Sequence, residues 1–367
     1  MSAETALLER ASEIVASFDI EGAATEAQPH AGGHIHDSFL VTAGGRRWIV
    51  QRLNTRVFAK PAHVMENIAA VSTHLARVLR REGAADIDRR VMRAVPARHG
   101  NWLAKDSRGD TWRVLAYIEG TTTSTVAADA AAAGAAARAF GHFQHQLAAY
   151  EGPPLHVTID HFHDTPRRYA AFHLALRTDP AKRAQGAAAE IAFAESHRPT
   201  ASLLVDAQHR GEIRETIAHH DAKISNVLFD RATHEALCVV DLDTVMPGLA
   251  LYDFGDLVRS MASAAAEDER DPSLAAAGAD RLAAIVEGYL EGAGDTISPA
   301  ERRLLPAAAK VITLEQGIRF LTDHLEGDRY YRAARPDHNL ERCRTQFALL
   351  ASLEALGADF ARMVETA

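Results

Sequence analysis

Residues 219–226 read HHDAKISN, and two short apolar runs follow them, NVLFD at 226–230 and ALCVVDLD at 236–243. A polar turn separates the two runs, so we predict a β-hairpin directly after the stretch. Most of residues 121–367 outside this region show the spacing of helices. A polar loop with its own hairpin, set into a helical region, therefore decides which fold we expect.

Four polar side chains stand at fixed offsets in and after this loop: Asp221, Lys223, Asn226 and Asp241. The predicted hairpin would carry Asn226 and Asp241 toward a common point at the edge of the loop. Phosphoryl transfer to a hydroxyl needs a carboxylate that accepts the proton, Asn and Asp oxygens that hold Mg²⁺, and a cation near the moving phosphoryl group. Asp221 could instead cap a turn, and Asp241 could merely end a strand. The ordered set of four favours the catalytic interpretation.

The first third of the chain predicts a small sheet with one long helix. Residues 37–52 hold two runs of β-forming residues around a Gly-Gly pair, which is typical of a hairpin. Residues 61–82 begin with Pro and keep helical spacing. Residues 90–120 indicate three short strands separated by turns. Residues 1–25 are expected to form a helix and a short connection. The two strands of the hairpin and the three strands after the long helix make a predicted sheet of five strands.

The length of 367 residues suits a protein with two lobes. We expect an N-lobe in residues 1–118 and a larger, mostly helical C-lobe in residues 119–367. The net charge of −9 speaks against nucleic acid or an anionic membrane as a partner. No apolar run is long enough for a transmembrane helix, and the N-terminus resembles an amphipathic helix rather than a signal peptide. We therefore expect a cytoplasmic protein, either a monomer or a homodimer.

Several other site classes lack their motifs in this sequence. The two cysteines, Cys238 and Cys343, form neither a CxxC pair nor a disulfide framework. The 19 histidines show no zinc-binding helix spacing. No phosphate-binding GxxxxGK[ST] loop and no GxSxG nucleophile motif are present.

The motif at 219–241 resembles the catalytic loop and metal-binding Asp of the protein-kinase-like superfamily. It lacks the Arg between His and Asp, and no DFG with an activation segment follows, which sets it apart from protein kinases. YDFGD at 252–256 stands where the small-molecule kinases keep a structural Asp. The pattern is similar to the aminoglycoside phosphotransferase and choline kinase family. Within it, FHDTPRRY at 162–169 and EQGIRFLTDHLEGDRYY at 315–331 resemble the bacterial N-acetylhexosamine 1-kinases.

This resemblance implies an α+β, protein-kinase-like fold with two lobes, and a role for each motif residue. Asp221 would be the catalytic base, and Lys223 would lie beside the γ-phosphate of ATP. Asn226 and Asp241 would hold Mg²⁺ against the ATP phosphates. Asp243 is a further candidate for the metal or for a sugar hydroxyl.

The nucleotide would bind to the N-lobe. Gly32 and Gly33 form the candidate phosphate-covering turn, because glycine lets backbone amides approach the phosphates. A Gly pair before a strand can equally be an ordinary turn. VLAYIEG resembles the hinge, so backbone groups of Ala116, Tyr117 and Ile118 are expected to meet the adenine.

The third strand should offer a cation to the α- and β-phosphates, and Arg52 is the candidate because the usual Lys is missing. Gln51 is the alternative at the neighbouring register. Glu66 on the long helix would be the acid that pairs with this cation. It could also be an ordinary solvated helix charge.

The acceptor would bind to the C-lobe. The resemblance implies that Arg319 and Tyr330 or Tyr331 line a sugar pocket, with His34 as a further contact and His36 as its neighbour in the glycine turn. The alternative for Arg319 is an ion pair within the helix, because Asp323 stands four residues on.

Together these features predict an ATP- and Mg²⁺-dependent kinase that phosphorylates the anomeric C1 hydroxyl of an N-acetylhexosamine. A neutral sugar needs a closed site whose polar groups match its hydroxyls. One alternative is another hydroxyl kinase of the same fold, acting on an aminoglycoside, choline, homoserine or another sugar. A nucleotide-binding scaffold without catalysis is the alternative from another class, and the missing Lys is its one support.

Overall fold

The computed structural model describes residues 3–30 and 35–367 of the chain, which folds into two compact units. The first unit comprises Met1–Thr122, Ala149–Asp160 and Leu228–Met246. The second unit comprises Thr123–Ala148, His161–Val227 and Pro247–Ala367. The first unit contains an antiparallel sheet and the second is mostly helical, which confirms the predicted α+β fold class. None of the helices in the described part of the chain has the length and apolar character that a membrane crossing needs.

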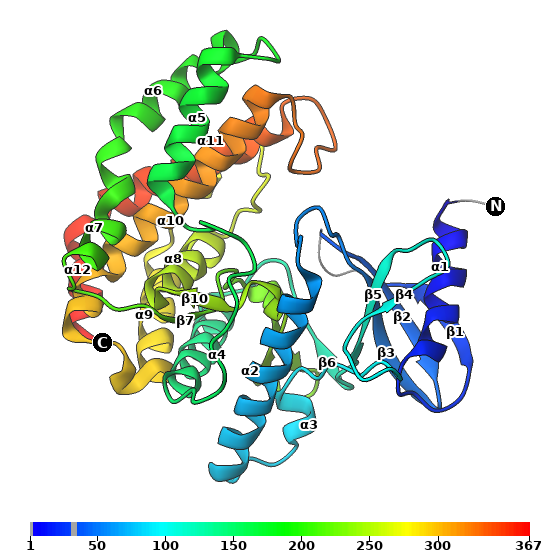
Figure 1. Ribbon diagram of the computed structural model, residues 1–367. Coiled ribbons are helices and arrows are strands. Elements are labelled where there is room, and N and C mark those ends of the chain that lie inside the picture. The colour runs from blue at the N-terminus through cyan, green and yellow to red at the C-terminus, as the bar shows by residue number, and fades with distance from the viewer. Residues whose placement is uncertain (1–2, 31–34) are drawn as a thin grey trace. The chain divides into compact units, whose positions relative to one another are not determined.

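The first unit is built on a five-stranded antiparallel sheet with the order β1-β2-β3-β5-β4 (Figure 1). Its strands are β1 (Ala24–Pro29), β2 (Asp37–Ala43), β3 (Arg46–Arg52), β4 (Ala104–Lys105) and β5 (Thr111–Ala116). The predicted hairpin at 37–52 is confirmed as β2 and β3. Its turn needs glycine twice, because Gly44 and Gly45 have φ angles of +59° and +73°.

The fifth strand of the sheet comes from a different segment than predicted. Residues 91–97 form only isolated bridges, from Ala94 to Leu115 and from Ala97 to Phe18, because Pro96 has no N–H to continue a ladder. The fifth strand is instead β1, which begins at the end of the segment expected to be a helix and a connection and continues beyond it. Its residues, ATEAQP, are mostly exposed and partly polar, as suits a strand at the edge of a sheet.

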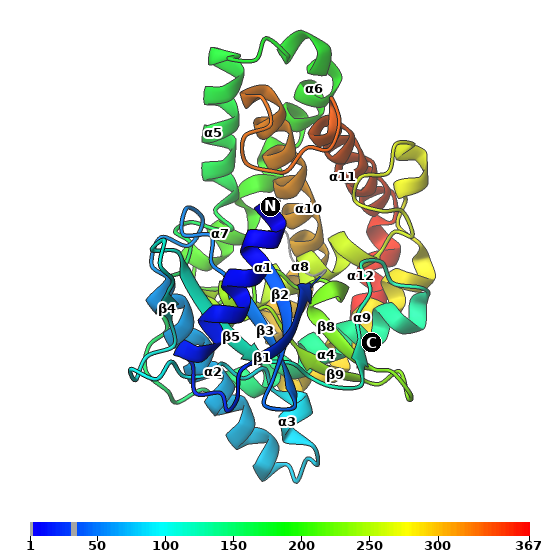
Figure 2. The same cartoon turned by 90° about the vertical axis from the view of Figure 1, so that its right-hand side faces the viewer.

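Helix α1 (Ala3–Ile14) covers one face of this sheet, as both views show (Figures 1 and 2). Ala11 and Ile14 pack with Val41, Val50 and Trp112 in one apolar core. Burial of such side chains contributes about 1.5–3 kcal/mol each. The first unit therefore owes its stability to a sheet that is sealed by an amphipathic helix.

Helix α2 (Pro61–Arg81) is the predicted long helix, followed by the single turn of α3 (Ile87–Arg90). Its buried face includes Val64, Ile68 and Leu75, at helical spacing. Asn67 lies fully buried on the same helix. Its amide donates to the carbonyls of His156 (2.8 Å) and Val245 (3.0 Å), so α2 is tied to two distant segments of its own unit.

The hairpin predicted after the opening loop is also confirmed. Strands β8 (Val227–Asp230) and β9 (Ala236–Val239) are neighbours in a three-stranded sheet with β6 (Thr121–Thr122). A short 3₁₀ helix (Leu242–Thr244) follows β9 and carries Asp243. The hairpin thus leads directly into the segment with the candidate metal ligand.

The second unit is a set of packed helices, and its Ala-rich stretch is a real helix with a buried face that includes Phe140, Phe143 and Leu147. In Figure 1, α5, α10 and α11 lie side by side around a shared apolar core. Its elements are α4 (Ala130–Ala148), α5 (Thr165–Thr178), α6 (Ala188–Ser196), α7 (Leu203–His209), β7 (Thr216–Ala218), β10 (Met246–Gly248, with Met246 still in the first unit), α8 (Ala250–Met261), α9 (Ala279–Ala293), α10 (Pro299–Glu326), α11 (His338–Ala355) and α12 (Gly357–Thr366).

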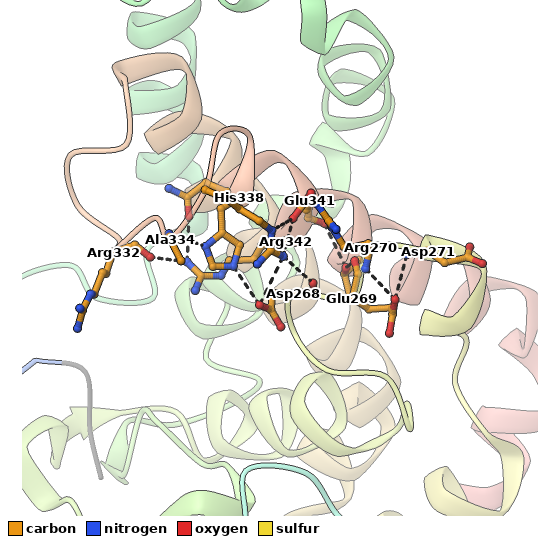
Figure 3. A network of polar contacts seen from close by, with 12 residues as sticks. Asp268, Glu269, Arg270, Asp271, Arg332, Ala334, His338, Glu341 and Arg342 are labelled. Carbon is orange, nitrogen blue, oxygen red and sulfur yellow. Dashed lines mark hydrogen bonds and ion pairs between the residues drawn. The ribbon is translucent and has the colours of Figure 1, made fainter. Parts of the chain in front are cut away.

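A polar network fixes the long loop between α8 and α9 against the start of α11 (Figure 3). Nε2 of His338 lies 3.0 Å from Asp268, and Nδ1 of His338 accepts the backbone N–H of Ala334. Nε of Arg335 donates to Glu341 at 2.7 Å. The loop therefore keeps a defined path although it has little regular structure.

Beneath the sheet of the first unit lies a buried charged cluster that the sequence did not reveal. The guanidinium of Arg113 on β5 forms a two-pronged ion pair with the carboxylate of Asp243, and Arg113 is 1% exposed. Nε of Arg113 also donates to Gln51 at 2.9 Å. His36 donates from Nε2 to Asp243 (2.6 Å), because its Nδ1 accepts the N–H of Asn54.

Arg113→Met should lower the free energy of unfolding by about 3–5 kcal/mol, because it removes the guanidinium that binds both oxygens of the buried Asp243 carboxylate and leaves only the contact with His36. The double variant Arg113→Met/Asp243→Leu should recover most of this loss. Arg52→Met is the matched control, since its ion pairs are partly exposed and worth about 0–1 kcal/mol. Urea unfolding measures all three, and equal losses in the two single variants would contradict the assignment.

Candidate active site

The loop after β7 brings three of the predicted catalytic residues together in the second unit. Nζ of Lys223 lies 2.8 Å from Oδ2 of Asp221. The side-chain amide of Asn226 donates to the backbone carbonyl of Asp221 (2.8 Å) and to its Oδ2 (3.0 Å). A 3₁₀ turn (Ile224–Asn226) brings the chain back, so that residue 226 reaches residue 221. The separation of Asp221 and Asn226 in the sequence therefore corresponds to a loop whose two ends are in contact.

The environment of Asp221 keeps its carboxylate ionised. Burial alone would raise the pKa of Asp221, but the charge and hydrogen bond of Lys223, with further contributions from His219 and Asn226, hold that pKa at about 2. The side chain is still 30% exposed, so a ligand could reach it. An ionised and accessible carboxylate can orient a hydroxyl and accept its proton.

The geometry of Asn226 suits a metal ligand. Its amide nitrogen is committed to Asp221, which directs Oδ1 away from that residue. Oδ1 has no hydrogen-bond partner among the residues that the structure describes. An amide oxygen without a protein donor is a group that a hard cation such as Mg²⁺ binds.

Asp253 of the YDFGD stretch holds the backbone of this loop. Its buried carboxylate accepts the backbone N–H groups of His219 (2.8 Å) and His220 (2.7 Å), and the amide of Gln144 (2.6 Å). Burial raises the pKa of Asp253 in spite of these hydrogen bonds. Asp253 lies on α8, so a rigid helix sets the position of the residues directly before Asp221.

The remaining acids of the motif belong to the first unit. Asp241 has φ +62°, in the left-handed region that Asp tolerates better than most residues do. Asp243 is 3% exposed, and both of its oxygens are bound by Arg113 and His36. Burial alone would raise the pKa of Asp243, but these partners hold it well below its usual range. A metal or a sugar would have to displace Arg113 or His36 to reach Asp243.

The predicted pairing of Arg52 with Glu66 is not formed in this structure. Arg52 instead donates to Asp37 (2.8 Å) and lies 3.1 Å from Asp110. Glu66 is exposed and contacts His156 at 2.7 Å. The reason is position, because Arg52 is the last residue of β3, and acids of the neighbouring strand and turn reach it first. The nucleotide-binding roles of Arg52 and Glu66 stay predictions.

Gln51, the candidate at the alternative register, has a different environment from Arg52. Gln51 faces inward, where it donates to Ser38 (2.9 Å) and accepts from Arg113, its partner across the sheet. Arg113 was missed by the sequence analysis, and the available signal was a charged residue between Trp112 and Val114 on an apolar strand. The interior cation of this sheet therefore comes from β5.

The candidate hinge follows β5. The N–H of Ala116 donates to Arg93 and that of Tyr117 to Arg47, while the carbonyl of Ile118 accepts from Thr121. Adenine recognition by these backbone groups stays a prediction. Gly32, Gly33 and His34 lie outside the described residues.

Arg319 lies among aromatic rings in the second unit. Its guanidinium is 5.3 Å from the ring centroid of Phe162 and 5.7 Å from that of Tyr331. The alternative ion pair with Asp323 is wrong. The carboxylate of Asp323 instead accepts the backbone N–H groups of Arg329, Tyr330 and Tyr331. This places the two tyrosines in a fixed turn after α10, with Tyr330 59% exposed.

No group of three or more His, Cys, Asp or Glu side chains within residues 3–30 and 35–367 is arranged to hold a metal ion. A metal here would be bound through Asn226 and through ligands from the nucleotide, in addition to a protein carboxylate.

Comparison with known proteins identifies the family and the fold of the chain. The model of the phosphotransferase enzyme family matches residues 26–293. A microcompartment-associated aminopropanol kinase is similar in structure, with a TM-score of 0.64 at 17% identity, over 96% of this chain and 98% of the other. An aminoglycoside phosphotransferase from Alicyclobacillus acidocaldarius gives 0.57 at 18% identity, over 96% of both chains.

A spectinomycin phosphotransferase, solved in complex with ADP and spectinomycin, gives a TM-score of 0.53 at 11% identity, over 95% of this chain and 98% of the other. These likenesses confirm the kinase-like fold, with an antiparallel sheet in the N-lobe and a helical C-lobe. Since the family model covers most of the sequence, the chain belongs to the phosphotransferase enzyme family.

Proposed function

We propose that this protein is an ATP-dependent kinase that phosphorylates the anomeric C1 hydroxyl of an N-acetylhexosamine. The observation that carries the kinase activity is the loop in which an ionised Asp221 is bound by Lys223 and Asn226. The choice of an N-acetylhexosamine as the acceptor is based on the resemblance of the stretches around Phe162 and Arg319 to the N-acetylhexosamine 1-kinases.

ATP is the proposed phosphoryl donor, which is supported by the ADP bound to the spectinomycin phosphotransferase of similar fold. Asn226 and Asp241 would hold Mg²⁺. The ion would neutralise charge on the ATP phosphates. Lys223 would exchange its contact with Asp221 for the γ-phosphate.

The low pKa of Asp221 defines what this residue can do. A carboxylate with a pKa of about 2 cannot deprotonate a sugar hydroxyl before the reaction begins. Its first task is to orient the hydroxyl by accepting a hydrogen bond from it. It then takes the proton as the new O–P bond forms, when the hydroxyl becomes strongly acidic.

A neutral sugar acceptor agrees with the charge around Arg319. Arg319 has no ion-pair partner within the described part of the chain, and Arg168 interacts with it as a second cation. Choline and aminoglycosides carry positive charge, so such a surface would repel them. Phe162 and Tyr331 offer ring faces, while the two guanidinium groups offer donors to hydroxyl and acetamido oxygens.

Asp221→Asn should lower kcat at least about a hundredfold, because removal of a catalytic base typically costs about 10²–10⁴. ATP binding, measured by calorimetry, should remain nearly unchanged. Asp206→Asn on the exposed face of α7 is the matched control. Retained turnover in Asp221→Asn would refute the assigned role, and equal losses in the control would point to a general effect.

Arg319→Ala should raise the KM for the sugar far more than the KM for ATP, because only the acceptor is proposed to contact Arg319. Arg167→Ala removes an exposed arginine of α5 and should change neither constant. Steady-state kinetics with one substrate varied at a time measures both. Equal increases in the two KM values would count against a sugar contact.

A screen of N-acetylhexosamines, other sugars, aminoglycosides, choline and homoserine should give phosphorylation of an N-acetylhexosamine. Phosphorus NMR of the product should show a phosphate on the anomeric carbon, coupled to its proton. A phosphate on any other hydroxyl, or turnover of choline or an aminoglycoside alone, would replace the sugar assignment with the corresponding kinase.

A further inference from the structure

A buried histidine that has no role in the function proposed above lies in the FHDTPRRY stretch and contacts the same loop residue that Asp253 binds. His163 comes just before α5 and is 7% exposed. Its Nε2 lies 3.2 Å from the backbone carbonyl of His220, and its Nδ1 lies 2.8 Å from Oε1 of Glu315 on α10. His163 therefore connects a long helix of the second unit to the residue directly before Asp221.

The two contacts of His163 define the protonation of its ring. A backbone carbonyl can only accept a hydrogen bond, and so can an ionised carboxylate. Glu315 is ionised: burial alone would raise its pKa, but His163 and then Arg319 hold that pKa below its usual value. Oε2 of Glu315 also accepts the hydroxyl of Thr165 at 2.6 Å. Both ring nitrogens of His163 therefore face acceptors, and both can donate only in the imidazolium form.

The residue that His163 holds is strained. His220 has φ +66°, a conformation that costs a residue other than Gly about 1–2 kcal/mol. Its N–H is bound by Asp253 and its carbonyl by His163, so both sides of the residue are fixed. The rings of His163 and His220 also stack, with centroids 5.3 Å apart. Strain of this kind persists where the surroundings over-determine it, and it is typical of functional sites.

We propose that Glu315 and His163 form a positioning pair, in which a doubly protonated His163 holds the His220 carbonyl and thereby sets the direction in which Asp221 projects. The kinetic part of this proposal rests on the kinase function proposed above. The charged and titratable groups that face His163 are Glu315 on α10, His220 in the loop and Tyr252 on α8, with Arg319 one turn beyond Glu315. The positive ring is balanced by Glu315.

His163→Ala should lower kcat about tenfold or more, since small displacements of a reacting group can cost up to about a hundredfold. The KM for ATP should stay within about twofold of that of the unaltered protein. Glu315→Gln should reduce kcat in the same way. The double variant should be no worse than His163→Ala alone, because the two residues act as a unit.

His173→Ala is the matched control, because this histidine also pairs with an acid, Glu195 at 2.7 Å, but lies farther along α5 and holds no part of the loop. Its kcat should be unchanged. Thermal unfolding of every variant checks that loss of activity is not loss of fold. If His163→Ala does not fold, Thr165→Val loosens Glu315 at similar side-chain volume and should lower kcat by a smaller factor.

Nitrogen NMR of histidine-labelled protein tests the pair without any turnover. At neutral pH, the His163 signals, assigned by their loss in His163→Gln, should be those of a ring with protons on both nitrogens. They should change to those of a neutral ring in Glu315→Gln. A neutral His163 ring in the unaltered protein overturns the proposal. So does a folded His163→Ala variant with kcat within about twofold of normal. Absence of phosphoryl transfer would refute the kinase function alone, and the NMR result would still decide the pair.

Discussion

The proposed active site depends on the carboxylate of Asp253, which accepts hydrogen bonds from two successive backbone N–H groups. Residues after β7 have no sheet partner of their own, and an unsatisfied buried N–H costs about 1–3 kcal/mol. Asp253 satisfies two such groups and lies on α8, which is packed in the core of its unit. The backbone directly before Asp221 is therefore held in place by a packed helix.

Each of the two units contains a buried, ionised carboxylate whose oxygens are bound by several donors. Asp243 is ionised within the first unit because Arg113 and His36 supply donors to its oxygens, and Glu315 is ionised within the second because His163 and Thr165 do. Such pairs add little net stability, since desolvation offsets most of the attraction. They do impose geometry, because any displacement would leave a charge unpaired in the interior. This is the arrangement expected where precise positions matter more than stability.

Much of this structure follows from local patterns. The two hairpins and the long helix were predicted, because apolar periodicity and turn glycines act over a few residues. The contact of Asn226 with Asp221 was not predicted, because it depends on the 3₁₀ turn between them. Strand β1 was missed because an edge strand needs no apolar face, and Arg113 because only the fold shows that Asp243 lies opposite it. Helical spacing suggested Asp323 as the alternative partner of Arg319, but the carboxylate of Asp323 instead binds three backbone N–H groups of the turn after α10. The binding of one metal ion by both Asn226 and Asp241 stays a prediction.

The charge around Arg319 constrains the acceptor more than the fold does. Burial lowers the pKa of Arg168, and the nearby charge of Arg319 lowers it further. A guanidinium group whose charge is disfavoured in this way would gain from a ligand with electronegative oxygens, and would lose from an amine. Kinases of this fold differ in acceptor charge, so the fold alone cannot choose among them. The pair of arginines beside Phe162 is the reason that the proposed acceptor is polyhydroxylated and carries no positive charge.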